Sequence, residues 1–261
     1  MTDQILTEQN GAVGWIVFNN PARHNAVSLE MWQGADDALR RFQADDTVRL
    51  IAITGAGEKS FISGADISKF EDERAQAKAV AKYDSVSTGF VEDLATTEKP
   101  TLARINGYCL GGGLNVALCC DLRIASEGSQ FGIPAAKLGL GYSYKNFRRL
   151  VDVIGLANAR EITFTGERID TTRAHEMGLL NRVVAKAALD DTVNTMTETI
   201  AANAPLTVRA FKINALEHAK DPADRDLERS RDAVKACFDS ADYIEGRRAF
   251  MDKRKPNFRG Q

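Results

Sequence analysis

The pattern of apolar and polar positions predicts alternating strands and helices over the first two thirds of the chain and mostly helices after that. Residues 5–8 and 14–18 form apolar runs on either side of Asn10-Gly11, which is a strong hairpin signal. An apolar run at 48–54, rich in β-branched residues, predicts a strand buried in a parallel sheet. Ser28 is a suitable N-cap for a helix that runs to about Phe42.

The remaining segments continue this alternation. Strands are expected at 101–105, 121–125 and 130–132, and helices at 71–96, 114–120, 145–165 with a break at Gly155, 171–177, and from 186 to about 254. Repeated strand–helix crossovers predict an α/β fold in which helices cover a parallel sheet. The sequence has no repeat of fixed period and no low-complexity linker, so we divide it into a ββα core at 1–185 and a helical C-terminal region at 186–261.

Two glycine-rich loops each follow a strand and lead into a helix. One contains Gly111-Gly112-Gly113, and the other runs from Gly55 to Ile67. Because a helix N-terminus exposes unpaired N–H groups and the positive end of the macrodipole, such a unit can hold an anion or an oxygen that becomes anionic. Close packing of the helix on a sheet explains the glycines equally well. The spacing matches neither a phosphate loop nor a dinucleotide-binding fingerprint.

Composition narrows the class of protein. The net charge of −2 gives no reason to expect nucleic acid or an anionic membrane as a partner. No apolar run approaches the ~20 residues that span a bilayer, and the first residues do not resemble a secretory signal. The cysteines lack the spacing of zinc ligands, so we expect no zinc site. Taken together, these points predict a cytoplasmic location.

Several motifs, in one order, resemble those of the crotonase, or enoyl-CoA hydratase/isomerase, superfamily. The resemblance runs from about Ile5 to Phe258 and implies a spiral of ββα turns with a helical C-terminal trimerisation region, hence a homotrimer or a dimer of trimers. It also implies chemistry on coenzyme A thioesters, with coenzyme A as part of the substrate and no separate cofactor. The matching motifs are Asn20-Pro21 with Arg23 and Asn25-Ala26, Phe61 to Ile67, Ile105 to Asp121, Phe131 to Pro134, Ala174 to Val184, and Phe250 to Pro256.

The resemblance also implies which residues form the site. The backbone N–H groups of Ala65 and Gly112 match the family's oxyanion hole, which agrees with the two glycine loops. Phe250 and Lys253 match residues that can reach a neighbouring subunit's coenzyme site. The full set of implied substrate contacts is Arg23, Ala26, Ser63, Gly64, Ala65, Asp66, Ile67, Gly111, Gly112, Ala135, Phe250 and Lys253.

The chain departs from the hydratases of the family at both of their glutamate positions, which are Asn115 and Ala135 here. Neither side chain exchanges a proton near neutral pH, although the Asn115 amide could hold a water. The segment around Tyr142 partly resembles the methylmalonyl-CoA decarboxylase branch, in which a tyrosine faces the departing carboxylate. The alternative is that Tyr142 is a wall residue whose hydroxyl bonds to the backbone.

Other polar residues near the motifs have more ordinary explanations. Tyr144 is expected to be a wall residue and Asp66 a helix cap. The histidines at 24, 175 and 218 are expected on the surface. The resemblance implies that four further residues follow the oxyanion loop in a segment bordering the acyl pocket: Glu71, Asp72, Tyr83 and Asp84. Each is a candidate proton source but is better explained as a solvated charge or a contact.

These observations leave three hypotheses for function. The leading one is an acyl-CoA lyase that stabilises an enolate, with loss of carbon dioxide as the reaction that needs the fewest protein acid–base groups. The second is an enoyl-CoA hydratase whose acid or base has moved to another residue. The third is an acyl-CoA binder without catalytic activity.

Overall fold

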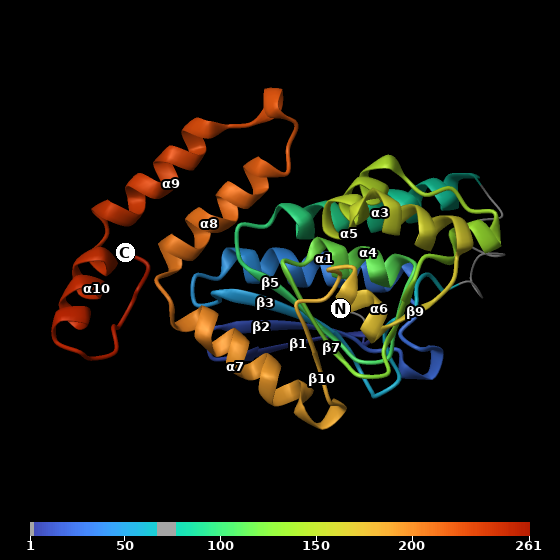
Figure 1. Cartoon of the computed structure of the whole chain (residues 1–261), viewed down its shortest axis with the longest axis horizontal. Helices are drawn as coiled ribbons and strands as arrows, with labels where there is room; N and C mark the ends of the chain where they lie inside the picture. The colour runs from blue at the N-terminus through green and yellow to red at the C-terminus, as the bar shows by residue number, and fades with distance from the viewer. Residues whose placement is uncertain (1–2, 67–76) are drawn as a thin grey trace.

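The computed structural model of the protein describes residues 3–66 and 77–261, with side chains from residue 82 onward in the second part. It contains a six-stranded sheet in the order β1-β2-β3-β5-β7-β10 and a four-stranded sheet in the order β4-β6-β8-β9 (Figure 1). The predicted hairpin is confirmed, because β1 (Ile5–Asn10) pairs antiparallel with β2 (Val13–Phe18).

The core is a spiral of ββα turns, as the resemblance implied. In each turn the first strand joins the large sheet and the second joins the small sheet, and all of these pairings are parallel. The three turns are β3 (Leu50–Gly55) with β4 (Ser60–Ile62), β5 (Thr101–Ile105) with β6 (Tyr108–Leu110), and β7 (Leu122–Ser126) with β8 (Gln130–Gly132).

Strand β3 is buried along its whole length because both faces of the large sheet are covered. Ile51 and Ile53 join the main core beneath the helices α1 (Leu29–Ala44) and α3 (Ala77–Thr96). Leu50 and Ala52 alternate with them and pack with Leu189 and Val193 of α7 (Leu189–Ala202), on the opposite face. The period of two along a strand therefore divides one apolar run between two cores.

Local signals set the helix boundaries. The Ser28 hydroxyl accepts the Met31 N–H and begins α1, as predicted. Helix α5 (Tyr144–Thr165) has its kink at Gly155, whose φ of 76° is outside the helical range. The short helix α6 (Thr171–Glu176) is followed by Gly178 at φ 81°.

The C-terminal helices α8 (Pro205–His218), α9 (Leu227–Asp239) and α10 (Ala241–Met251) extend away from the sheets as an arm (Figure 1). Asp121, the final residue of the motif Ile105 to Asp121, holds this arm to the core. Its carboxylate accepts from the Thr101 N–H and hydroxyl and, at 2.6 Å, from the ammonium of Lys212 on α8. None of the helices in the described residues is long and apolar enough to span a membrane.

The sequence prediction found β8 but missed four other strands of two or three residues: β4, β6, β9 (Ile169–Asp170) and β10 (Arg182–Val184). Strands of two or three residues are too short to show alternation, and only pairing with distant neighbours defines them. Helix α4 (Gly112–Cys119) begins two residues before the predicted start at 114. Short 3-10 helices occupy Pro21–Arg23, Pro134–Leu138, Lys186–Ala188 and Pro222–Asp224.

Candidate active site

The two glycine loops, which are far apart in sequence, meet in space. A Cβ added at Gly64 would lie 3.5 Å from the Leu110 carbonyl oxygen and 3.9 Å from the Gly112 nitrogen. A Cβ added at Gly111 would lie 3.9 Å from the Gly64 Cα. The backbone at Gly64 therefore lies beside the start of α4, as expected if both loops serve one site.

The fold makes different demands on the three consecutive glycines. Gly111 adopts φ 55° and ψ −118°, which an L side chain rarely allows. A Cβ at Gly113 would lie 2.1 Å from the Ile62 carbonyl oxygen, so this glycine permits tight packing of α4 on β4. A Cβ at Gly112 would find only ordinary contact, 3.8 Å from Trp32. Close packing thus explains Gly113, and Gly112 is the glycine that the fold itself does not require.

The N–H groups of Ala65 and Gly112 have no protein acceptor among the described residues. For Ala65 the reason is the short parallel bridge to Val27, in which the Gly64 carbonyl accepts the Val27 N–H and the Asp66 N–H donates to the Val27 carbonyl. Because successive peptide groups of an extended chain point to opposite sides, the Ala65 N–H points away from Val27. For Gly112 the reason is its place in the first turn of α4.

The loop that carries Arg23 and Ala26 is held by a buried asparagine whose role the sequence analysis did not assign. The Asn25 side chain is fully buried, and its amide donates to the carbonyls of Ala56 and Ser60 at 3.0 and 2.8 Å. Its oxygen accepts the Asn20 N–H. Asn25 has φ 55°, a left-handed conformation that asparagine tolerates better than most residues. The Asn-Ala pair in the motif was the available signal for this role.

Arg23 and Asp66, both predicted substrate contacts, pair with each other. One guanidinium nitrogen of Arg23 lies 3.1 and 2.9 Å from the two carboxylate oxygens of Asp66. The Asp66 side chain is 8% exposed and that of Arg23 is 53% exposed, so the cation presents a face to solvent. The helix that Asp66 was expected to cap would begin outside the described part of the chain, so this role stays a prediction. Ile67, Glu71 and Asp72 also lie outside the described residues, and their roles stay predictions as well.

One face of α4 carries the first departure from the hydratases. Asn115 is 6% exposed, and its Oδ1 has no hydrogen-bond partner among the described protein groups. Its N–H bonds to the Gly111 carbonyl, so it belongs to the first turn of α4. Three and four residues separate Gly112, Asn115 and Cys119, which places them on one side of the helix.

Tyr142 packs on the main core, and its hydroxyl oxygen is buried with no hydrogen-bond partner among the described protein groups. The interpretation of Tyr142 as a residue bonded to backbone is therefore wrong. Burial raises the pKa of the Tyr142 hydroxyl, and the nearby Cys119 thiol adds to the rise, so the group stays protonated. Burial also raises the pKa of Cys119 to about 11.

The other predicted residues divide between this site and the surface. Ala135 is half-buried against the core in the 3-10 helix after Gly132. The Tyr83 hydroxyl accepts the Trp32 indole N–H and donates to the Val27 carbonyl, both at 3.0 Å, so it anchors the strand bridge. Exposed positions are taken by Tyr144, Asp84, His24, His175 and His218.

Phe250 and Lys253 lie on the C-terminal arm, away from the glycine loops of their own chain. Phe250 is 86% exposed near the end of α10, and Lys253 follows with φ 53°. Figure 1 shows α10 at the far end of the arm from α4. Within one chain the structure does not bring these two residues together with the other predicted contacts.

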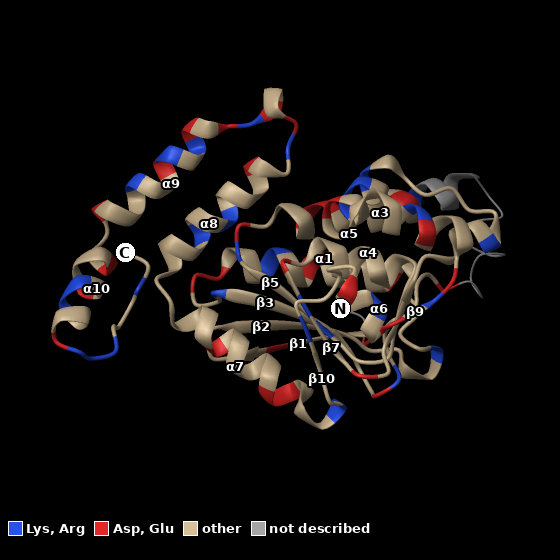
Figure 2. Ribbon diagram, in the orientation of Figure 1, with Lys and Arg blue, Asp and Glu red and all other residues tan. Residues whose placement is uncertain are grey.

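Arg123 is a buried cation that the sequence analysis passed over. It is 7% exposed, and its guanidinium donates to the carbonyls of Leu179, Ala117 and Cys120. Two of these acceptors end α4, so Arg123 places positive charge at the negative pole of that helix. Figure 2 shows that α4 itself carries no charged residue. The described residues contain no cluster of His, Cys, Asp or Glu able to hold a metal ion.

Comparison with known proteins agrees with this geometry. The family model described as enoyl-CoA hydratase/isomerase matches residues 8–261. The chain belongs to the crotonase (enoyl-CoA hydratase/isomerase) superfamily. A crotonyl-CoA hydratase of Syntrophomonas wolfei is 32% identical over 256 residues, covering 98% of each chain. A short-chain-enoyl-CoA hydratase of Clostridium acetobutylicum is 31% identical, covering 97% of this chain and 96% of that one.

Solved structures support the same membership. The crystal structure of an enoyl-CoA hydratase/carnithine racemase from Magnetospirillum magneticum superposes with a TM-score of 0.94 at 35% identity. The match covers 100% of this chain and 97% of that one. The crotonase fold is therefore confirmed, and the chain is a crotonase-family acyl-CoA enzyme. Resemblance to the decarboxylase branch finds no support in these relatives, several of which are named hydratases.

Proposed function

We propose that the N–H groups of Ala65 and Gly112 form an oxyanion hole that stabilises the enolate of a coenzyme A thioester. The observation that carries this proposal is the meeting of two glycine loops whose N–H groups lack protein acceptors. Donors fixed by the fold need no reorganisation when negative charge develops on the thioester oxygen. The N-terminus of α4 and the neutralised C-terminal end of that helix both favour this charge.

The coenzyme would lie along the loops that converge on these donors. Ala26, Ser63 and Gly64 border the strand bridge, and the exposed face of Arg23 is suited to a phosphate oxygen. Family membership supports this placement. A neighbouring subunit would supply Phe250 and Lys253.

Gly112 offers a direct test with a matched control. Gly112→Pro removes the N–H donor at a helix position that tolerates proline, and we expect turnover to fall roughly 10²–10³-fold. Gly112→Ala keeps the donor, and its Cβ would lie 3.8 Å from Trp32, so turnover should stay within a few-fold of wild type. An unchanged rate in a folded Gly112→Pro variant would refute the oxyanion-hole proposal.

For the reaction, we propose a lyase step in which the leaving group generates the enolate, as in loss of carbon dioxide from a malonyl-type thioester. This fits a site with Asn115 and Ala135 at the hydratase glutamate positions. The names of several relatives favour the second candidate, hydration of an enoyl-CoA with a relocated acid or base. Turnover of malonyl-CoA against crotonyl-CoA separates the two, and tight binding of both without turnover would indicate a non-catalytic binder.

A further inference from the structure

Arg123 is a buried cation that has no carboxylate partner among the described residues. Its guanidinium donates to three backbone carbonyl oxygens. The acidic residue nearest to it in sequence, Asp121, is paired with Lys212 at 2.6 Å. Burying a charge is costly, and a neutral donor could bond to carbonyl oxygens at lower cost. The positive charge of Arg123 therefore indicates a role beyond hydrogen bonding.

The backbone around Arg123 fixes where this charge lies. The Arg123 N–H donates to Oδ1 of Asn181 at 2.8 Å, and the Asn181 N–H donates to the Arg123 carbonyl at 2.9 Å. The guanidinium donates to the Leu179 carbonyl at 2.7 Å and to two carbonyls at the end of α4. These contacts from two sides hold the cation at the C-terminal end of that helix.

The two carbonyls at the end of α4 belong to the negative pole of the helix. Ala117 lies in the last turn, and Cys120 is the C-cap. The partial negative charge at such a helix end opposes the binding of an anion at the other end, and a cation placed there offsets it. Because α4 carries no charged residue (Figure 2), no side chain of the helix itself cancels the effect of Arg123.

The opposite end of α4 carries Gly112, one of the two oxyanion donors. The helix has eight residues, which at ~1.5 Å per residue separates its ends by about 12 Å. Residues 113–119 are all buried, so solvent screens the interior between the two ends only weakly. At an effective dielectric constant of about 20, a unit charge about 12–15 Å from a developing anion changes the rate about 3–10-fold.

We propose that Arg123 is a positioning residue that strengthens the oxyanion hole through α4. Its charge neutralises the negative pole of the helix, so the Gly112 N–H lies in a more positive field. The effect is largest on the enolate, which carries the negative charge, and small on the neutral thioester. This inference rests on the proposed function, since it acts on the oxyanion hole.

The carbonyl stretching band of a bound thioester reports on this field. Butyryl-CoA labelled with ¹³C at the thioester carbonyl suits the measurement, because it lacks both the double bond and the carboxylate of the two candidate substrates. Donors that polarise the carbonyl move its infrared band to lower frequency. We expect such a shift on binding to wild type, a smaller shift for Arg123→Gln, and a shift close to wild type for Arg123→Lys, which keeps the charge.

Turnover gives a second measurement. For malonyl-CoA or crotonyl-CoA, whichever wild type converts, kcat should fall about 3–10-fold in Arg123→Gln while KM changes little. Arg104→Gln is the matched control, because it removes the same charge from the neighbouring strand β5, where Arg104 pairs with Asp190 of α7 at 2.6 Å. It should keep the wild-type band shift and kcat.

The outcomes separate the charge from the hydrogen bonds. Circular dichroism and melting temperature check that each variant is folded, and if Arg123→Gln does not fold, Arg123→Lys alone decides. A role of the charge predicts that Arg123→Lys retains the band shift, whereas a role of the guanidinium hydrogen bonds alone predicts that it loses the shift.

A full band shift in Arg123→Gln, or an equal loss in Arg123→Gln and Arg123→Lys, would overturn the assignment to Arg123 and leave the oxyanion hole intact. If butyryl-CoA shows no shift on binding to wild type, or if Gly112→Pro keeps the wild-type shift, the proposed function fails together with this inference.

Discussion

At the scale of single residues, the chemistry depends on the absence of a carboxylate at positions 115 and 135. Asn115 lies in the first turn of α4, and Ala135 is half-buried in the 3-10 helix that follows Gly132. The family's hydratases carry glutamates at both positions. General acid–base groups typically contribute ~10²–10⁴-fold each, so hydration of crotonyl-CoA by the wild-type protein should be very slow.

Restoring the carboxylates tests this argument. The double variant Asn115→Glu with Ala135→Glu should hydrate crotonyl-CoA at least ~10²-fold faster than wild type, because it supplies both an acid and a base. The decrease in absorbance of the enoyl thioester measures the rate, and the double variant Asn115→Gln with Ala135→Gln controls for added bulk. Efficient hydration by wild type would contradict the prediction and would assign the proton transfer to another residue.

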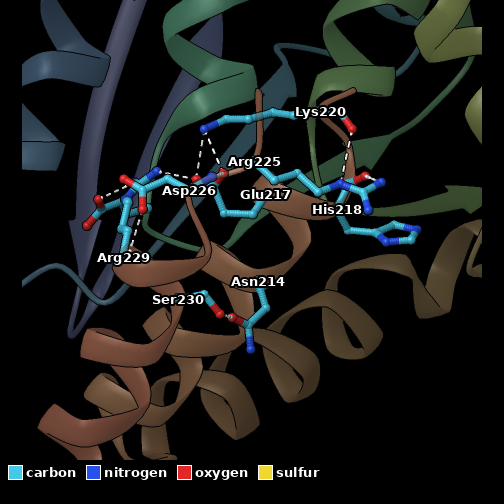
Figure 3. A network of polar contacts seen from close by, with 9 residues as sticks. Asn214, Glu217, His218, Lys220, Arg225, Asp226, Arg229 and Ser230 are labelled. Carbon is cyan, nitrogen blue, oxygen red and sulfur yellow. Dashed lines mark hydrogen bonds and ion pairs between the residues drawn. The ribbon is translucent and has the colours of Figure 1, made fainter. Parts of the chain in front are cut away.

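At the scale of elements, a polar network fixes the turn between α8 and α9. Glu217 is 2% exposed, and its carboxylate accepts from Lys220, from Arg229 and from the Asp226 N–H (Figure 3). Arg229 also donates to Glu98 at 2.6 Å, two residues after the end of α3, so the network ties the arm to the core. Figure 2 shows that charges of both signs alternate on α9, in contrast to α4.

This network makes the arm sensitive to acid. Hydrogen bonds from Lys220 and from the Asp226 N–H lower the pKa of Glu217 from 4.5 to about 2. A depressed carboxylate pKa stabilises the fold above the unfolded value and loses this contribution as pH falls through the folded value. The stabilisation from Glu217 should therefore be complete above about pH 5 and disappear towards pH 2.

Melting temperatures between pH 6 and pH 2 check this expectation. Glu217→Gln should melt below wild type at pH 6, and the difference should vanish near pH 2. Glu228→Gln, on the exposed side of α9, should follow the wild-type curve, since Glu228 forms no ion pair within the described residues. A constant gap between Glu217→Gln and wild type at all pH values would contradict the linkage.

At the scale of the whole molecule, the C-terminal arm has an apolar side that one chain leaves uncovered. A cavity of about 620 Å³ lies between α8, α9 and α10, lined by residues that include Phe211, Phe238 and Phe250. These three rings are 71%, 61% and 86% exposed. Several large apolar side chains exposed side by side are typical of a protein–protein interface.

The apolar side predicts an interface, and the resemblance to the crotonase superfamily implies that the assembly is a homotrimer or a dimer of trimers. Sedimentation at micromolar concentration should give the trimer mass or twice that mass for wild type, and a smaller species for Phe211→Glu, because the new charge would be buried without a partner. Leu6→Glu serves as the control, since Leu6 lies on the edge strand β1 and is 40% exposed. A wild-type monomer would refute the prediction.

The sequence by itself determined those features that depend on local chemistry or on several motifs in order. Asn10-Gly11 specified the hairpin, Ser28 the start of α1, and Gly155 the kink in α5. The ordered motifs specified the family and its ββα core. Each of these signals lies within a few residues or in the order of motifs along the chain, so it can be recognised without coordinates.

Only the tertiary structure decided how distant groups meet. It assigned different causes to Gly111 and Gly113, because one depends on a backbone angle and the other on the approach of β4. It paired Arg23 with Asp66 and left the buried Tyr142 hydroxyl without a partner among the described protein groups. Pairing and burial are properties of residues far apart in sequence, and a linear pattern carries no distance between them.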